Sequence, residues 1–254
     1  MKTIVLFSII LGVTLSCGEQ PEEISTVKKP EVVEEATEKM SPERYVEHSL
    51  RIRKNEKSTI NKYYAECNGD DSTDLILTVN LLERAMNDAI AKGNVAKNAE
   101  TGYMGHYNYL IFRDGLTKQY SPPIIIPSSA MSPASVSFEN VQSDFYKDIL
   151  VDFKVTNGGF REYYTIVNSI PRIVLQLPIY TELGTDTVKA YSISYEPGSH
   201  SLAKDIVVYK GKIANKTFTV PDEVYGYYPA ITPTKEIERR WFFNPGKFKY
   251  FTNK

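Results

Sequence analysis

The chain has 254 residues, of which 42 % are hydrophobic and 24 % are charged, and its formal net charge is −1. This length is enough for one sizeable hydrophobic core or for two small ones. The balanced charge argues against nucleic acid or a strongly acidic substrate as the partner. The 18 tyrosines and 11 phenylalanines favour β structure.

The N-terminal segment has the pattern of an export signal. Lys2 supplies a positive charge, and residues 4–15 form an apolar run that is too short to span a membrane as a helix. A Ser-Cys-Gly sequence centred on Cys17 follows. This ending resembles the lipobox of bacterial lipoproteins, which implies that residues 1–16 are a signal peptide and that Cys17 carries lipid in the mature chain. Thr14 stands where that family prefers leucine, so an ordinary signal peptide or a buried free cysteine is the alternative.

Residues 17–40 are the predicted tether, a disordered segment that follows the lipid. They include no aromatic residue and more acids than bases, so they cannot bury enough surface to offset their ordering entropy. Glu19, Glu22 and Glu23 resemble the acidic surface-export signal of Bacteroidota lipoproteins. These resemblances imply a lipid anchor in the bacterial outer membrane, on its periplasmic or its cell-surface face. Residues 41–254 are predicted to form a single mainly-β globular domain.

Two helices are predicted at the start of this domain. Ser41 and Pro42 form a helix start, with the serine as N-cap and the proline in the first turn, and the helix is expected to run to about Lys57. Apolar residues recur at helical spacing within residues 80–99, and Gly93 offers a stop.

From about residue 103 onward the pattern predicts β structure, with turns marked by Asn, Asp, Gly and Pro. The Arg-Asp-Gly sequence at residues 113–115 predicts a hairpin turn, and the Asn-Pro-Gly sequence at residues 244–246 predicts a closing hairpin. Prolines on both sides of residues 124–126 predict an edge strand or a buried crossover. The predicted strands are residues 107–112, 116–120, 124–126, 145–156, 162–167, 172–180, 187–195, 204–209, 214–220, 241–243 and 247–251.

One short pattern occurs three times, an aspartate at the start of an apolar and strand-like run. The aspartates are Asp74, Asp148 and Asp205, which lie 74 and 57 residues apart. Such spacings suit a repeated unit of about four strands, as in the blades of a propeller. The predicted fold is therefore mainly β with one or two helices, built from repeated antiparallel β units.

The loop before the first of these aspartates carries oxygen-bearing side chains at alternate positions, namely Glu66, Asn68, Asp70, Ser72 and Asp74. It resembles the FG-GAP repeat of integrin-type and VCBS-like proteins, although Asp71 replaces the turn glycine of that family. The resemblance implies degenerate repeats in a propeller-like fold, with these positions as metal ligands. About 210 residues follow the tether, which is few for a propeller of four-stranded blades, so an incomplete or decorated β fold is an equal alternative.

The same loop suits calcium on chemical grounds. Calcium takes about six to eight oxygen ligands, and alternate residues of a tight loop point the same way, so the four side chains and the carbonyl of Ser72 can converge. An EF-hand is excluded, because Leu77 stands where its last glutamate belongs and a strand follows. The alternative is an acidic turn whose side chains bond their own backbone. The loop before Asp148 keeps Asn140, Gln142 and Asp144, and its lower charge predicts weaker calcium binding.

No set of residues identifies a reaction. His48, His106 and His200 lack zinc-ligand spacing, and the sequence has no serine-hydrolase, phosphate-loop or dinucleotide motif. Once Cys17 is lipidated, Cys67 is the one remaining thiol, so no internal disulfide is expected. Its acidic neighbours raise its pKa, which indicates a structural role.

The sequence therefore favours a non-catalytic, lipid-anchored envelope protein with a binding or assembly role and a protein or glycan partner. The alternative is a surface-exposed hydrolase or glycan-handling protein, for which Tyr225, Tyr227 and Tyr228 would supply an aromatic platform. A pocket that pairs two close carboxylates with these rings would favour the alternative.

Overall fold

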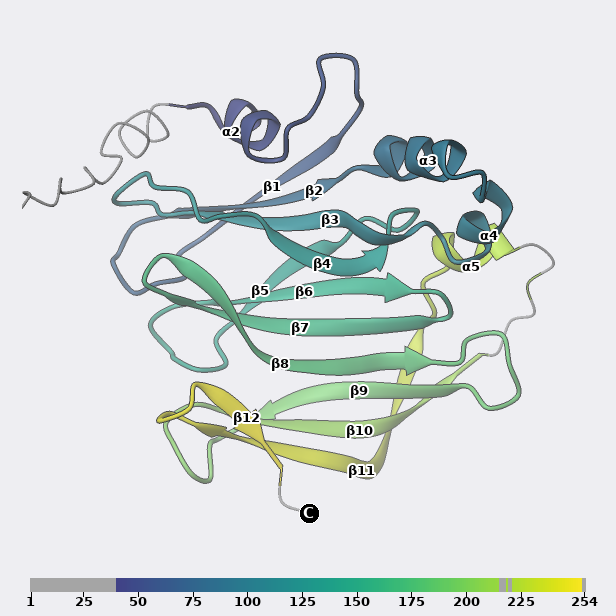
Figure 1. Ribbon diagram of the computed structural model, residues 1–254. Helices are drawn as coiled ribbons and strands as arrows, with labels where there is room; N and C mark the ends of the chain where they lie inside the picture. The colour runs from purple at the N-terminus through teal and green to yellow at the C-terminus, as the bar shows by residue number, and fades with distance from the viewer. Residues whose placement is uncertain (1–39, 215–217, 219–220, 253–254) are drawn as a thin grey trace, which may run out of the picture. The chain divides into compact units, whose positions relative to one another are not determined.

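The computed structural model describes residues 40–214, 218 and 221–252 (Figure 1). They form antiparallel sheets with short helices, which confirms the predicted mainly-β class. The described part contains four helices, more than the one or two that the sequence predicted. The predicted signal peptide, Cys17 and nearly all of the tether lie outside the described residues, as does most of the predicted strand 214–220.

The elements follow one another as an antiparallel meander. The helices are α2 (Pro42–Ser49), α3 (Leu82–Ala91), α4 (Val95–Glu100) and α5 (Pro221–Gly226). Among the described residues, no helix combines the length and the apolar character needed to cross a membrane. The strands are β1 (Thr59–Ala65), β2 (Asp74–Asn80), β3 (Met104–Arg113), β4 (Ile124–Ser129), β5 (Ser135–Glu139), β6 (Asp148–Val155), β7 (Gly158–Val167), β8 (Ile170–Thr181), β9 (Lys189–Glu196), β10 (Asp205–Ile213), β11 (Ile231–Asn244) and β12 (Lys249–Phe251).

The strands form two sheets, and each sheet keeps the order of the chain. Strands β1 to β4 form one sheet, and β5 to β12 form the other. Within the larger sheet, β8 and β9 share only two register pairs, Tyr180 with Ala190 and Thr181 with Lys189. The larger sheet is therefore two four-stranded meanders joined at one corner. The chain thus has a first meander (β1–β4), a second (β5–β8) and a third (β9–β12).

The three predicted aspartates occupy equivalent places in these meanders. Asp74, Asp148 and Asp205 are the first residues of β2, β6 and β10, the second strand of each meander. Both sheets have free ends in their strand order, so no closed barrel is present among the described residues. A propeller-like ring stays a prediction.

Two hydrophobic clusters join neighbouring meanders. In one cluster Ile76 and Phe112 of the first meander pack with Ile149 of the second. In the other, Leu150 of the second meander packs with Ile206 of the third. Since successive residues of a strand face opposite ways, β6 is buried on both faces. This explains why its sequence is a nearly continuous apolar run rather than an alternating one.

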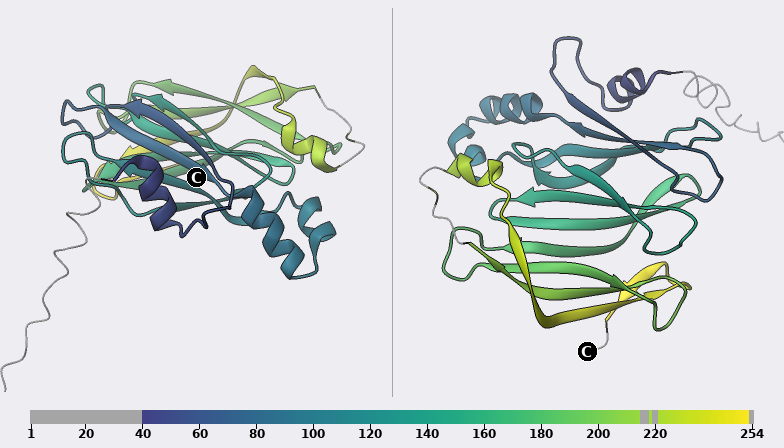
Figure 2. Two further views of the ribbon diagram at one scale, coloured as in Figure 1. Left: turned by 90° about the horizontal axis from the view of Figure 1, so that it is seen from above. Right: turned by 180° about the vertical axis from the view of Figure 1, so that it is seen from behind.

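Helices α2 and α3 lie beside the first meander, and Figure 2 shows them on the same side of it. Ser41 caps α2 as predicted, but the helix ends at Ser49 rather than near Lys57. Its Tyr45 and Val46 are buried in a cluster with β2. The predicted helix 80–99 is divided into α3 and α4 at Gly93, whose φ of +66° suits the end of a helix.

Several strand boundaries differ from the prediction. Residues 116–120 form a turn with one isolated bridge from Tyr120 to Arg113 instead of a strand. The edge strand predicted around residues 124–126 is present as β4, and the closing hairpin is present as β11 and β12. Strand β5 was not predicted, because it is only five residues long and carries only two apolar side chains.

Candidate functional site: the aspartate-braced loops

The β1–β2 loop (residues 66–73) is held by the buried carboxylate of Asp74. The backbone N–H of Cys67 donates to Oδ2 of Asp74 over 2.9 Å, and the N–H of Gly115 donates to Oδ1 over 2.7 Å. The aspartate therefore ties its own loop to the β3–β4 loop (residues 114–123). Two buried N–H groups that would otherwise lack partners are satisfied in this way.

Asp148 and Asp205 brace the corresponding loops in the same way. Asp148 accepts the backbone N–H groups of Val141 and Gln142 over 3.0 and 2.7 Å in the β5–β6 loop (residues 140–147). Asp205 accepts the N–H of Ser199 over 3.2 Å in the β9–β10 loop (residues 197–204). In every case a donor lies six or seven residues before the aspartate. The three sequence patterns are therefore one structural motif.

Equivalent backbone hydrogen bonds also join these loops to each other. The N–H of Lys147, directly before Asp148, donates to the carbonyl of Glu66 over 2.9 Å. The N–H of Lys204, directly before Asp205, donates to the carbonyl of Val141 over 2.7 Å. The three loops thus lie side by side.

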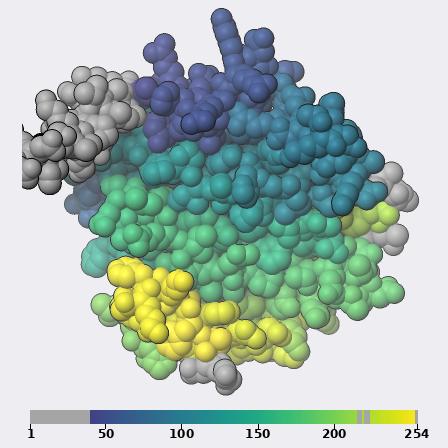
Figure 3. All heavy atoms as spheres, viewed as in Figure 1, coloured from purple at the N-terminus to yellow at the C-terminus, as the bar shows by residue number. Residues whose placement is uncertain are grey.

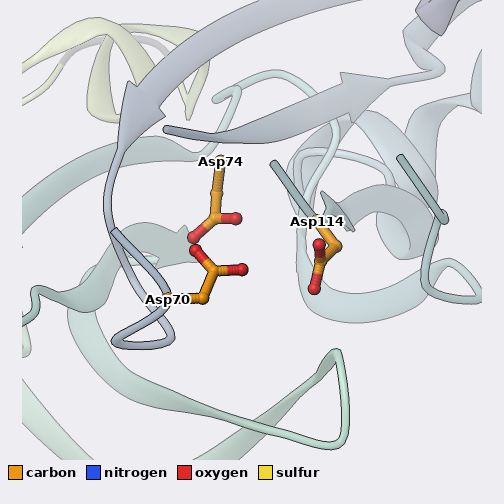
Figure 4. A group of neighbouring side chains, drawn as sticks. All are labelled: Asp70, Asp74 and Asp114. Carbon is orange, nitrogen blue, oxygen red and sulfur yellow. The ribbon is translucent and has the colours of Figure 1, made fainter. Parts of the chain in front are cut away.

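Three carboxylates gather at the first of these loops. Ligand atoms of Asp70, Asp74 and Asp114 lie within 4.8 Å of one another (Figure 4). Burial raises the pKa of Asp74 to about 6 against the opposing effect of its two N–H donors, and the charges of Asp70 and Asp114 add to the rise. Burial also acts on Asp114, but hydrogen bonds from Thr117 and Ser169 outweigh it and hold its pKa below the ordinary value.

The sequence predicted only part of this cluster. Asp70 and Asp74 come together as expected, whereas Asp114 was predicted only as a turn residue. Asn68 lies beside them, but its amide nitrogen donates to Asp70 over 3.0 Å and to Asp114 over 3.2 Å. Glu66 instead accepts the N–H of Gly69. The signal that could have revealed Asp114 is its place in a turn that the hairpin prediction already marked.

The negative charge of the three carboxylates suits a cation, but the neighbouring side chains are not oriented to bind one. The N–H of Ser72 donates to Asp70 over 2.9 Å, and the side-chain oxygen of Asn68 accepts the N–H of Asp70. These are the local turn contacts of the predicted alternative, an acidic turn that bonds its own backbone. Calcium would need Asn68 to present its oxygen instead of its nitrogen, because calcium binds oxygen ligands.

The two other predicted features of this region are structural. Cys67 is buried, and burial together with Asp74 raises its pKa, as its acidic neighbours predicted. In the second loop, the amide nitrogen of Asn140 donates to the carbonyls of Ser143 and Tyr146. Asn140 therefore braces its loop.

Lys154 on β6 is a buried cation that the sequence did not single out. Its Nζ donates to the carbonyls of Tyr225 and Tyr227 over 2.9 and 2.6 Å and lies 3.5 Å from the centre of the Tyr228 ring. Burial lowers its pKa to about 8. Lys154 thus fastens the segment around α5 to the second meander.

A cavity of about 180 Å³ lies next to this lysine. Asp152, Lys154, Tyr180 and Tyr228 are among its lining residues. Both carboxylate oxygens of Asp152 accept from Arg161 over 2.7 Å. The cavity therefore has aromatic walls, but its lining holds one carboxylate, and that group is already paired.

Comparison of the chain with protein-family models, with curated proteins and with solved structures finds no match. A function therefore has to follow from the residues and contacts above.

Proposed function

We propose that this chain is a non-catalytic, lipid-anchored protein of the bacterial envelope with a binding or assembly role. The observation that carries the proposal is the use of the buried aspartates. Asp74, Asp148 and Asp205 each accept backbone N–H groups of the loop before them. Carboxylates that accept backbone N–H groups in this way hold loops in a fixed shape. Such loops suit the recognition of a partner better than catalysis of a reaction.

The export pattern supplies the location. Export and a lipid anchor are supported by the N-terminal pattern, which consists of an apolar run, Cys17 and an acidic segment after it. In this proposal calcium, where it binds, braces the β1–β2 loop through Asp70, Asp74 and Asp114. The three repeated loops would then occupy the positions of FG-GAP loops, and only the β1–β2 loop would carry enough negative charge to bind a metal.

The alternative is a hydrolase or glycan-handling protein that uses the cavity beside Lys154. Its aromatic wall, Tyr180 and Tyr228, favours this alternative. The pairing of Asp152 with Arg161 weighs against it, since hydrolysis of a glycoside calls for two carboxylates with separate roles.

Mass spectrometry of the mature chain tests the anchor. We expect an N-terminal Cys17 that carries lipid, and we expect the Cys17→Ser chain to leave the membrane fraction. A mature chain that begins elsewhere and carries no lipid would contradict the proposal.

Turnover assays test the absence of catalysis. We expect no hydrolysis of glycoside or ester substrates. Turnover by the natural chain that Asp152→Asn abolishes would establish the alternative instead.

A further inference from the structure

Six loops gather at one end of the meanders, and we call this end the loop end. They are the two loops of each meander that follow an odd-numbered strand, at the left in Figure 1 and at the right in the view from behind in Figure 2. Side-chain contacts tie them together beyond the backbone bonds described above. Ser169 of the β7–β8 turn donates to Asp114 over 3.0 Å, and Tyr250 of the C-terminal hairpin donates to the carbonyl of Lys204 over 3.0 Å. The loop end is therefore one continuous surface.

Five of these six loops present a large apolar side chain to solvent. Phe145 in the β5–β6 loop is 90 % exposed, and Leu202 in the β9–β10 loop is fully exposed. Ile170 begins β8, and Phe248 lies in the β11–β12 turn of the C-terminal hairpin, which projects at the lower left of Figure 3. Leu116 in the β3–β4 loop completes the set. Single exposed apolar residues are common, but one on each of five neighbouring loops is a pattern.

A cation accompanies each apolar tip. Arg172 follows Ile170 by two residues, and both are exposed on β8 with a buried residue between them, so they point the same way. Lys147 and Lys204 follow Phe145 and Leu202 at the same spacing. Lys147 donates to the side chain of Asn140 and Lys204 lies 4.0 Å from Glu139, so each would exchange a protein partner for a phosphate. Lys118 follows Leu116 likewise, and Lys247 and Lys249 flank Phe248.

The sixth loop, β1–β2, differs in both respects. It carries Glu66, Asp70 and Asp71, and the exposed Tyr64 lies before it on β1, so residues 66–73 themselves hold no exposed large apolar side chain. The loops with an exposed apolar side chain are therefore the same loops that carry a cation beside it. Anionic headgroups would attract the cations of the other five loops and would repel this acidic loop.

The exposed apolar and basic side chains of α3 and α4, which lie away from the loop end, are arranged differently. Ile90 on α3 and Val95 on α4 are exposed and are followed two residues later by Lys92 and Lys97. On a helix, however, residues two apart point to different sides, so the apolar and the basic groups do not share one surface.

The chain enters the folded body beside the loop end. The hydroxyl of Tyr120, which closes the β3–β4 loop, donates to the carbonyl of Met40 over 3.2 Å. Met40 is the residue at which the tether reaches the domain. A lipid carried by Cys17 would therefore be joined to the domain through a residue beside the loop end.

We propose that the loop end docks on a lipid surface that contains anionic headgroups. Phe145, Leu202 and Phe248 enter the boundary between headgroups and acyl chains, while the neighbouring cations bind phosphate groups. This inference rests on the proposed function for the anchor, and it adds which surface of the protein faces the bilayer. Separate tips on separate loops suit a fluid lipid surface better than a single protein groove.

Tryptophan quenching in vesicles tests this docking. Trp241 is the only tryptophan in the chain, so Phe145→Trp, Leu202→Trp and Ile90→Trp are each made together with Trp241→Phe. The lipid-modified full chain is reconstituted into vesicles of phosphatidylcholine and phosphatidylglycerol with brominated acyl chains. We expect a blue shift and a loss of emission for Phe145→Trp and Leu202→Trp, and neither change for Ile90→Trp. Equal quenching of all three, or none at the two tips, would overturn the inference.

Charge reversal supplies the second test. We expect Lys247→Glu with Lys249→Glu to weaken the quenching of Leu202→Trp, and we expect Lys92→Glu with Lys97→Glu to leave it unchanged. Equal effects of the two pairs would overturn the role of the loop-end cations. A chain that does not join the vesicles at all contradicts the proposed lipid anchor, whereas a chain that joins them with its tips unquenched contradicts only the docking.

Discussion

The backbone N–H of Lys204 donates to the carbonyl oxygen of Val141 over 2.7 Å, across the boundary between the third and second meanders. Lys147 makes the equivalent bond to Glu66 one meander earlier. Both donors stand directly before a buried aspartate, which holds the donating loop in place. The repeated aspartate therefore sets the stacking of the meanders as well as the shape of its own loop.

The substitution Asp148→Asn is expected to destabilise the fold. The N–H groups of Val141 and Gln142 share Oδ2 of Asp148, and the side-chain amide of Gln142 donates to Oδ1. Asparagine keeps only one of the two oxygens, so one of these donor sets loses its acceptor, at a cost of about 1–3 kcal/mol. Urea unfolding measures this loss. The control is Asp144→Asn, an exposed acid of the same loop, which is expected to change stability by less than about 0.5 kcal/mol. Similar losses in the two variants would show that Asp148 is no brace.

Stability is expected to fall as the pH rises from about 4 through 6. Burial raises the pKa of Asp74 and of Asp148 to about 6 in the folded state, above the ordinary value near 3.8. The folded state therefore holds more protons than the unfolded state in this window, and raising the pH removes that advantage. Each carboxyl contributes a slope of up to about 1.4 kcal/mol per pH unit. Urea unfolding at several pH values should show a smaller slope for Asp148→Asn, and an unchanged slope would exclude Asp148 as a source.

When Asn68 turns its side-chain oxygen toward the cluster, calcium is expected to raise the melting temperature at pH 7.5 and to have little effect at pH 5. Above its pKa of about 6, Asp74 is ionised next to Asp70 and Asp114, and a cation relieves their repulsion. At a calcium concentration of about 100 times the dissociation constant, the stabilisation is about 2.7 kcal/mol. Thermal unfolding with calcium and with a chelator measures it. Asp114→Asn should abolish the effect while Asp144→Asn keeps it, and a melting temperature indifferent to calcium would leave the loop as a turn that bonds its own backbone.

The features that the sequence revealed are local ones. An aspartate that caps its own loop lies within seven residues of its donors, so Asp74, Asp148 and Asp205 were recognisable as one pattern. The role of Asp114 was not, because its neighbours Asp70 and Asp74 lie about 40 residues earlier and meet it only through the pairing of β2 with β3. The end of α2 was missed for a similar reason. Its apolar side packs against β2, and Leu50 and Ile52 join the same cluster from beyond the helix end at Ser49, so the apolar pattern does not mark where the helix stops.

The substitution Lys154→Met is expected to loosen the segment around α5. Methionine keeps the apolar stem but removes the ammonium that donates to the carbonyls of Tyr225 and Tyr227, at a cost of about 1–3 kcal/mol. Hydrogen exchange should rise in residues 223–229 and stay unchanged in β10, whereas faster exchange in both regions would indicate a general loss of structure.

The pH dependence of stability gives a second check on Lys154. The lowered pKa of about 8 means that the unfolded state binds the extra proton more readily, so stability should rise as the pH increases from about 8 to 10. Lys154→Met should remove that rise, and its persistence would assign the rise to another group.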